Sequence, residues 1–558
     1  MNSLHEPIRP KSFVFFFIIG AAIAVCSNAE ERNSAVSGVI LNRASGEPIQ
    51  NATVRLCEVP AGKAVSLCTS SVSGSEGRFV FRGRFPGRYY MKADASGYLS
   101  DFLVLAGRGG SEFDLTAGTE RMVRLALWPE GSITGRIVDE SGRPFPGLSV
   151  AAVGETFSYG KRSLRRYQYW GGPSETLTDK DGRFRINSLK PGNYFIEAVA
   201  GFPSKTDRPV LARGYLPVFY PDAAFLTNAR SVCVEAGRRV EVDFHLAPRK
   251  QFYARARLEI PANFKREFEP ISGLWREDGE VDPAWENEYD RRTQIFTAGP
   301  LPPGSYDIEV KTGIYDTDLV GRYKFEILDH DPEPIAVAMR QPFALHVSVK
   351  TPQGFRTRTP FSTRLRLQPD NELMDGIDES GWPIPKDGAL RPVLQPGRHY
   401  RLFLFSDDDV YIKSARFGNQ DVLATGLTLD GASQDKLELA LERAKGAVLG
   451  TVITRTGAPA SGADVKLMLS GADSHYVFKS VVADEQGRFL FSGVPPGSYN
   501  VVALSNAVRD WEFGSMEWSQ TERSANTVEI GDSALSPITL EAVTLRYDSA
   551  LCQLGETQ

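Results

Sequence analysis

Hydrophobic and polar residues alternate over short stretches of this chain, which is the pattern of β-strands with one buried face. In one such stretch Tyr194, Ile196 and Ala198 lie on one face, and Phe195 and Glu197 lie on the other. Turn-forming residues interrupt these stretches about every ten residues, and no stretch has a convincing helical period. The pattern therefore predicts a protein made of short strands.

The clearest repeat is a Pro-Gly pair followed by a tyrosine, which recurs at intervals of roughly one hundred residues. We predict a type II turn at each copy, because proline presets φ at the second position and glycine supplies the positive φ of the third. The tyrosine then opens a strand with a large side chain to bury. The copies are Pro86-Gly87-Arg88-Tyr89, Pro191-Gly192-Asn193-Tyr194, Pro303-Gly304-Ser305-Tyr306, Pro496-Gly497-Ser498-Tyr499 and the looser Pro396-Gly397-Arg398-His399-Tyr400. Such an interval is the size of a domain.

Two further phrases occur in three of the repeats. One is a polar-glycine turn that leads into an aromatic strand, at Gly77-Arg78-Phe79, Gly182-Arg183-Phe184 and Gly487-Arg488-Phe489. The other opens the repeat as strand, turn and strand, beginning at Gly38, Gly135 and Gly450. Each complete repeat thus holds about six or seven short strands, as in a Greek-key sandwich.

Together these phrases resemble the carboxypeptidase regulatory-like domain, a transthyretin-like β-sandwich that is also grouped with carbohydrate-binding-like folds. The match is close at residues 35–126, 127–247 and 445–545, and it is weak at 248–340 and 341–444. We therefore expect an all-β protein of about five tandem Greek-key β-sandwiches, transthyretin-like or immunoglobulin-like. Residues 1–29 would be a signal peptide and residues 546–558 a tail.

The amino terminus has the features of an export signal. Arg9 and Lys11 precede an apolar run over residues 13–25, and Ser27 and Ala29 are small residues at the positions that a signal peptidase reads. We expect cleavage after Ala29, with a membrane anchor and a lipoprotein acylated at Cys26 as the alternatives. The mature chain would then have no transmembrane segment and would be secreted, periplasmic or at the cell surface.

Cysteine positions suggest one disulfide bond. Cys57 and Cys68 flank Gly62-Lys63, which suits a two-residue hairpin turn and would place the two cysteines opposite each other. Two unpaired buried thiols are the alternative. Cys233 and Cys552 are expected to be unpaired.

Composition and motifs argue against several functions. The 558-residue chain has a net charge of only −5, which argues against a nucleic-acid partner. The motifs of zinc peptidases, serine hydrolases and phosphate-binding loops are missing from the sequence, so we expect no enzyme, no cofactor and no metal site. Asp179 and Asp181 imitate the start of a calcium loop without its later ligands, and Asp407-Asp408-Asp409 is expected to be a solvated run of like charges.

Aromatic residues near arginines are the best candidates for ligand binding. They lie in a long insertion of the second repeat: Tyr159, Arg165, Arg166, Tyr167, Tyr169 and Trp170. Aromatic rings could stack on sugars while arginines meet acidic groups, but a packing loop or a disordered loop is the alternative. Weaker clusters are Tyr215 with Phe219 and Tyr220, Trp511 with Trp518, and Trp275 with Trp285.

The first hypothesis for function is an exported, non-catalytic structural or interaction protein of the cell envelope. The alternative is a carbohydrate-binding protein that recognises extracellular polysaccharide through its aromatic loops. The resemblance also implies a third class, an accessory subunit of a peptidase or of an outer-membrane transport system. The partners would accordingly be polysaccharides or envelope proteins.

Overall fold

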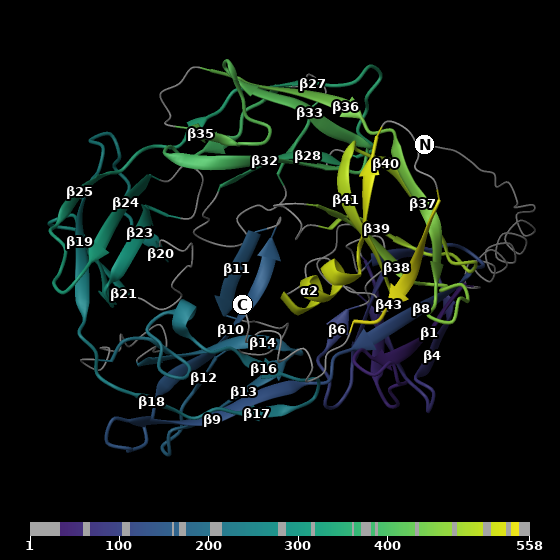
Figure 1. Cartoon of the computed structure of the whole chain (residues 1–558), viewed down its shortest axis with the longest axis horizontal. Helices are drawn as coiled ribbons and strands as arrows, with labels where there is room; N and C mark the ends of the chain where they lie inside the picture. Colours follow the sequence, from purple (N-terminus) through teal and green to yellow (C-terminus); the bar gives the residue numbers. More distant parts are fainter. Residues whose placement is uncertain are drawn as a thin grey trace, which may run out of the picture. The chain divides into compact units, whose positions relative to one another are not determined.

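The computed structural model describes most of the chain from Ser34 onward, and strands dominate it (Figure 1). The described residues are 34–59, 67–102, 112–158, 161–166, 175–200, 215–276, 286–313, 319–359, 362–369, 381–385, 389–429, 435–470, 477–505, 515–531 and 537–545. They divide into one unit that ends at Glu130 and another that begins at Gly131.

The first unit is a sandwich of two sheets. One sheet has the order β4-β1-β8, and the other has the order β3-β2-β5, with β6 and β7 also on β5. The strands are β1 (Ser34–Asn42), β2 (Thr53–Glu58), β3 (Cys68–Val72), β4 (Arg78–Arg84), β5 (Gly87–Asp94), β6 (Asp101–Phe102), β7 (Glu112–Leu115) and β8 (Glu120–Leu127). Alternate residues such as Val36, Leu56, Phe79 and Met91 fill the core between the sheets. The first strand, β1, pairs antiparallel with β4 and parallel with β8, the last strand.

The second sandwich repeats this arrangement at the start of the second unit. Its first strand, β9, pairs antiparallel with β13 and parallel with β17 and β18. The opposite sheet has the order β11-β10-β14-β15, with β12 on β10 and β16 on β14. The elements are β9 (Gly131–Asp139), β10 (Leu148–Ser158), β11 (Lys161–Arg166), β12 (Glu175–Leu177), β13 (Arg183–Leu189), β14 (Gly192–Ala200), β15 (Val218–Phe219), η1 (Leu226–Asn228), β16 (Val232–Val234), β17 (Arg239–Glu241) and β18 (Phe244–Leu246).

The two repeats with weak sequence signals are also two-sheet sandwiches, each with its own hydrophobic core. The third has sheets β21-β22-β19-β25 and β20-β23-β24. Its strands are β19 (Phe252–Glu259), β20 (Ile271–Arg276), β21 (Glu286–Asp290), β22 (Ile295–Leu301), β23 (Gly304–Lys311), β24 (Val320–Ile327) and β25 (Ile335–Ala338).

The fourth sandwich has sheets β30-β27-β36-β33-β34 and β29-β28-β32-β35, and a short β26-β31 pair. Its strands are β26 (Phe343–Ala344), β27 (Val347–Lys350), β28 (Thr363–Pro369), β29 (Trp382–Pro383), β30 (Ala389–Leu390), β31 (Val393–Leu394), β32 (Arg398–Ser406), β33 (Val410–Phe417), β34 (Gln420–Asp421), β35 (Leu427–Leu429) and β36 (Leu437–Arg443). Strand rhythm and the Pro-Gly-tyrosine phrase therefore accompany a sandwich even where the other two phrases are weak.

The fifth sandwich carries an α-helix, α2 (Ser515–Ser524), which contacts β41. Its strands are β37 (Gly446–Ile453), β38 (Asp464–Leu469), β39 (Val477–Val482), β40 (Arg488–Val494), β41 (Gly497–Leu504), β42 (Asn526–Ile530) and β43 (Ile538–Val543). The expectation that no helix is present is wrong here. Met516 and Trp518 are the only large apolar residues of this helix, too few to produce a helical period, although Trp518 is buried.

The tyrosine of the Pro-Gly phrase has a hydrogen-bonding role in every repeat. Its hydroxyl donates to the carbonyl oxygen of the residue before the proline. The bonds run from Tyr89 to Phe85 (2.9 Å), Tyr194 to Lys190 (2.9 Å), Tyr306 to Pro302 (2.7 Å), Tyr400 to Gln395 (3.2 Å) and Tyr499 to Pro495 (3.1 Å). The ring fills the core while the hydroxyl holds the chain that enters the strand.

The predicted type II turn is wrong at the four regular copies of this phrase. Gly304 and Gly497 are nearly extended, with φ of 158° and 156°, and Gly87 and Gly192 have no positive φ. Gly397, in the looser copy, is left-handed with φ of 77°. The bond from the tyrosine hydroxyl does not decide the glycine conformation, because Tyr400 makes it in the looser copy as well.

The second phrase does require its glycine. Gly182 has φ of +71°, and a Cβ atom there would lie 2.3 Å from the carbonyl oxygen of Ile137. Gly77 and Gly487 occupy the same position in their repeats, each with positive φ. Only glycine fits this close approach of two chain segments.

Disulfide bonds involve three of the described cysteines. Cys57 on β2 and Cys68 on β3 face each other in the sheet register and are bonded, with their Cα atoms 4.0 Å apart. Cys233 on β16 is also in a disulfide, so the expectation that it is unpaired is wrong. No fixed sequence spacing marks that second bond, and its other half lies outside the described residues.

Candidate functional site

The insertion of the second repeat begins as a hairpin. Strand β10 continues past the end of the sandwich sheet and pairs antiparallel with β11, with Arg165 opposite Gly154 and Arg166 opposite Val153. The side chains of these two arginines are not among those that the structure describes. The other four predicted ligand-binding residues, Tyr159, Tyr167, Tyr169 and Trp170, lie outside the described residues. Ligand binding by this insertion therefore stays a prediction.

The weaker aromatic cluster of the second repeat packs against the sandwich. Phe219 is buried on β15 and joins a small core with Val153. The Tyr215 ring meets Phe145 edge-on at 4.9 Å, and its hydroxyl donates to Glu140 at 2.8 Å. Tyr220 packs on the main core of this sandwich. These side chains pack against the sandwich, and this packing accounts for their clustering without a ligand.

The calcium-like Asp179 caps a turn. One of its carboxylate oxygens accepts hydrogen bonds from the backbone N–H groups of Asp181 (2.9 Å) and Arg183 (2.8 Å). Asp484 makes the same pair of bonds to Gln486 and Arg488 in the fifth sandwich. The described residues contain no group of three acidic, histidine or cysteine side chains that could hold a metal ion.

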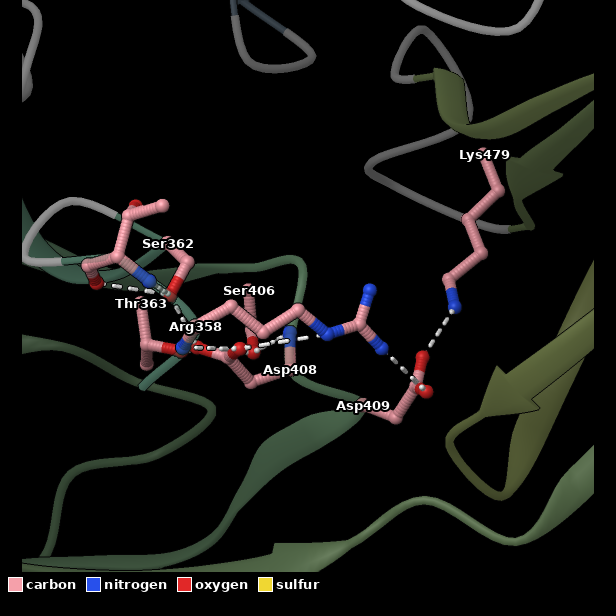
Figure 2. A network of polar contacts seen from close by, with 8 residues as sticks. Arg358, Ser362, Thr363, Ser406, Asp408, Asp409 and Lys479 are labelled. Atoms are coloured by element: carbon pink, nitrogen blue, oxygen red, sulfur yellow. Dashed lines mark hydrogen bonds and ion pairs between the residues drawn. The ribbon is translucent and has the colours of Figure 1, made fainter. Parts of the chain in front are cut away.

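Polar networks between consecutive sandwiches are the strongest candidate for a functional feature. The first surrounds Asp408, in the turn between β32 and β33 of the fourth sandwich (Figure 2). Its carboxylate accepts hydrogen bonds from the hydroxyls of Ser362 (2.5 Å) and Thr363 (2.7 Å) and from the backbone N–H of Arg358 (2.9 Å). Asp408 is buried, so the expectation of a solvated acidic run is wrong at this residue.

Hydrogen bonding keeps Asp408 charged. Burial alone would raise the pKa of this carboxyl group, but the bonds from Ser362, Thr363 and Arg358 outweigh it and hold the pKa below the ordinary value of 3.8. The charged carboxylate of Asp408 therefore holds the turn between β32 and β33, which also contains Asp409.

Asp409 connects the fourth sandwich to the fifth. Its carboxylate lies between Arg358, at 3.7 Å, and Lys479 of β39, whose Nζ donates to it at 3.1 Å (Figure 2). Lys479 also donates to the carbonyl oxygens of Ser492 (2.6 Å) and Gly493 (2.9 Å). We call these residues the Asp409 joint.

Glycine at position 493 makes room for the Asp409 joint. Gly493 has φ of +62°, and a Cβ atom there would lie 2.1 Å from Oδ1 of Asp409. Asp409 itself is held with φ of 52°, a conformation that aspartate tolerates better than most residues. Only Ala444 and Lys445 lie between the last strand of the fourth sandwich and the first strand of the fifth.

A second network joins the third sandwich to the fourth. Glu309 on β23 and Arg398 at the start of β32 are both buried, and Nε of Arg398 donates to Glu309 Oε2 at 2.8 Å. A second bond runs from Nη2 of Arg398 to the same oxygen. Lys311 and Arg322 lie near Glu309, at 3.6 and 3.7 Å. We call these residues the Glu309 joint.

Neither joint is predicted from the sequence. Glu309 is separated from Arg398 by 89 positions, and Asp409 from Lys479 by 70. The alternation of β23 does predict that Glu309 faces away from the core, because it follows Ile308, which is buried in that core. Nothing in the sequence indicates that this outer face meets another sandwich.

One family of known proteins matches this chain in three places. The sequence model of the carboxypeptidase regulatory-like domain matches residues 35–127, 132–247 and 447–532, which together are more than half of the chain. No curated protein matches the chain. Among the described residues, none of the helices is long and apolar enough to cross a bilayer.

Several solved structures are similar to parts of the chain. The minor pilin GBS52 of Streptococcus agalactiae is 15% identical, with 42% of this chain and 99% of that chain covered and a TM-score of 0.21. The shaft pilin SpaA of Lactobacillus rhamnosus GG is 11% identical, with 39% and 98% covered and a TM-score of 0.18. The Bacillus anthracis TIE protein is 11% identical, with 89% and 68% covered and a TM-score of 0.13. TM-scores this low carry no argument about function. The three family matches do establish the kinship, and the chain belongs to the family of proteins built from carboxypeptidase regulatory-like domains.

Proposed function

We propose that this protein is an exported, non-catalytic structural protein of the cell envelope, in which tandem sandwiches are held at defined joints. The signal sequence at residues 1–29 would direct export to the periplasm, the cell surface or the medium. The proposed domains are residues 35–126, 127–247, 248–340, 341–444 and 445–545.

The Glu309 joint is the observation that carries this proposal. Separating the two sandwiches would take the buried Arg398 away from the carboxylate that it bonds, and breaking a buried ion pair costs about 3–5 kcal/mol. Domains that are joined by flexible linkers need no such contact, because the linkers alone connect them. A buried ion pair between sandwiches therefore supports a role in which spacing matters.

A non-catalytic role is supported by the family and by the sequence. The regulatory-like domain resembles accessory modules that accompany catalytic domains, and the sequence contains no motif of a hydrolase or a nucleotide-binding enzyme. Both networks described above are ion pairs and hydrogen bonds that join sandwiches.

Two measurements test the proposal. Fractionation of cells that express the tagged chain should recover it from the envelope or the medium, and recovery from the cytoplasm would reject the proposal. Spin labels on the exposed residues Lys324 and Glu438, in the third and fourth sandwiches, should give one narrow distance distribution. The Arg398→Met variant should broaden that distribution, and a broad distribution in the unmodified chain would argue against a defined joint.

Polysaccharide binding needs a separate test. Affinity electrophoresis of the exported chain against neutral and acidic polysaccharides should show no retardation if the role is structural. Retardation that the Tyr169→Ala, Trp170→Ala variant abolishes would replace the structural proposal with carbohydrate binding by the second repeat.

A further inference from the structure

Strand β3 leaves one side of its backbone open at the edge of the first sandwich. It pairs with β2 on one side, and among the described residues no strand pairs with its other side. Glu58 N–H donates to the carbonyl oxygen of Leu67, and antiparallel residues alternate in the direction of their hydrogen bonds. Thr69 and Ser71 therefore bond toward β2, whereas Cys68, Ser70 and Val72 direct their N–H and C=O groups away from the sheet.

The open edge is accessible to a partner. Four of the five residues of β3 are exposed, and Val72 retains 60% of its accessible surface. Leu67, just before the strand, retains 73%. The edge thus offers both unused backbone groups and apolar surface.

Edge strands at the corresponding place in other sandwiches are protected against pairing. On the corresponding edge of the second sandwich, β12 contains Glu175 and β11 contains Lys161, Arg162, Arg165 and Arg166; β29 of the fourth sandwich contains Pro383, and β39 of the fifth contains Lys479. Charges and proline are the usual devices that prevent edge-to-edge association. Strand β3 has neither, and residues 64–75 contain no charged side chain.

We propose that β3 pairs antiparallel with β3 of a second copy of this chain, which goes beyond the proposed function and does not depend on it. The exposed backbone groups are symmetric about Ser70, so Ser70 would pair with Ser70 of the other copy. Cys68 would then pair with Val72 of the other copy, which covers exposed apolar surface beside the Cys57–Cys68 disulfide. The strand itself carries no charged side chain in either copy, and Arg84 of β4 is a cation bonded to it, at Thr69 Oγ1 (2.8 Å). Such a self-complementary contact closes as a two-fold dimer.

Sedimentation of the chain over a range of concentrations tests the proposal. An edge contact of this size should give a dimer with a dissociation constant on the order of 10–100 µM. A chain that sediments as a monomer up to about 100 µM would overturn the proposal.

Substitutions at Ser70 locate the contact. Ser70→Pro removes an N–H group that points away from β2, so the sandwich keeps its own hydrogen bonds while the dimer is lost. Ser70→Ala keeps that N–H group and should dimerise as the unmodified chain does. Val72→Lys provides a second test that leaves the backbone unchanged, and it should weaken the dimer by about fivefold or more because a charge replaces apolar surface that the contact covers.

Unchanged thermal unfolding of the first sandwich shows that each variant is folded. Dimerisation of Ser70→Pro at the affinity of the unmodified chain would overturn the assignment to β3. Loss of the dimer in Ser70→Ala would do the same, because that variant retains every backbone group on the edge.

Discussion

A tyrosine hydroxyl secures the entry to one core strand in each sandwich by holding the carbonyl oxygen just before the Pro-Gly pair. In the first sandwich this hydroxyl belongs to Tyr89, which bonds to Phe85. Burial, together with the charge of Glu58, raises the pKa of Tyr89, so its hydroxyl remains a donor well above neutral pH. The motif therefore combines a ring for the core with a donor for the backbone.

Removing this hydroxyl should destabilise the sandwich that contains it. We expect Tyr89→Phe to lower the free energy of unfolding of the first sandwich by about 1 kcal/mol, since a partly buried carbonyl group loses its donor. Fluorine NMR of the 5-fluorotryptophan-labelled chain in urea measures this at Trp128, which is buried in the same unit. Tyr98→Phe is the matched control because no hydrogen bond of its hydroxyl is described, and an equal loss in both variants would contradict the role of the hydroxyl.

Asp408 should make the fourth sandwich sensitive to acid. Its pKa is lowered in the folded chain, so its contribution to stability is complete above the ordinary pKa of 3.8 and is lost as the pH falls below that value. The urea midpoint reported by Trp382, which packs against the fourth core, should therefore decrease below about pH 4. The Asp408→Asn variant should be less stable than the unmodified chain at pH 6, and its urea midpoint should decrease less in acid. An unchanged decrease in that variant would show that other groups cause the acid sensitivity.

Elements of neighbouring sandwiches meet through charged residues that a strand pattern places outside the core. Strand β23 directs Ile308 and Val310 into the third core and Glu309 outward, where the start of β32 covers it. The pattern therefore locates the outward residue correctly, but it does not identify the residue that meets it. Contacts between sandwiches depend on how their surfaces fit, which alternation within a single strand does not encode.

Charge balance within the Glu309 joint predicts unequal effects of removing its two partners. Glu309→Gln removes the carboxylate that the buried Arg398 bonds, whereas Arg322 keeps Asp307 at 2.9 Å, and it should lower the free energy of unfolding of the third and fourth sandwiches by about 3–5 kcal/mol. Arg398→Met should cost less, because Lys311 and Arg322 still lie close to the carboxylate. Denaturation followed at Trp382 measures both variants.

The exposed pair of Lys413 and Glu442 supplies the control for this comparison. Lys413→Met should change the stability by at most about 1 kcal/mol, since exposed ion pairs contribute little. Equal losses from Lys413→Met and Glu309→Gln would show that burial of the joint adds nothing.

At the scale of the whole molecule, much of the fold could be predicted from the sequence because one phrase recurs in all five sandwiches and two more in three of them. The tandem all-β architecture and the glycine of the second phrase follow from strand rhythm and turn chemistry. Helix α2 and the disulfide at Cys233 could not be predicted, since the first has almost no apolar period and the second depends on a distant cysteine. The joints depend on contacts between residues far apart in sequence, and the candidate site of the second repeat stays a prediction.

Parallel pairing of the first strand with the last has a mechanical consequence. In four sandwiches the first and last strands lie side by side and run in the same direction: β1 with β8, β9 with β18, β19 with β25 and β37 with β43. In the fourth, where the short β26 comes first, β27 pairs in the same way with the last strand, β36. Tension applied to the ends of the chain pulls such a pair past each other, so the hydrogen bonds between the strands share the load and are not opened one at a time. A sandwich connected in this way resists stretching between its two ends.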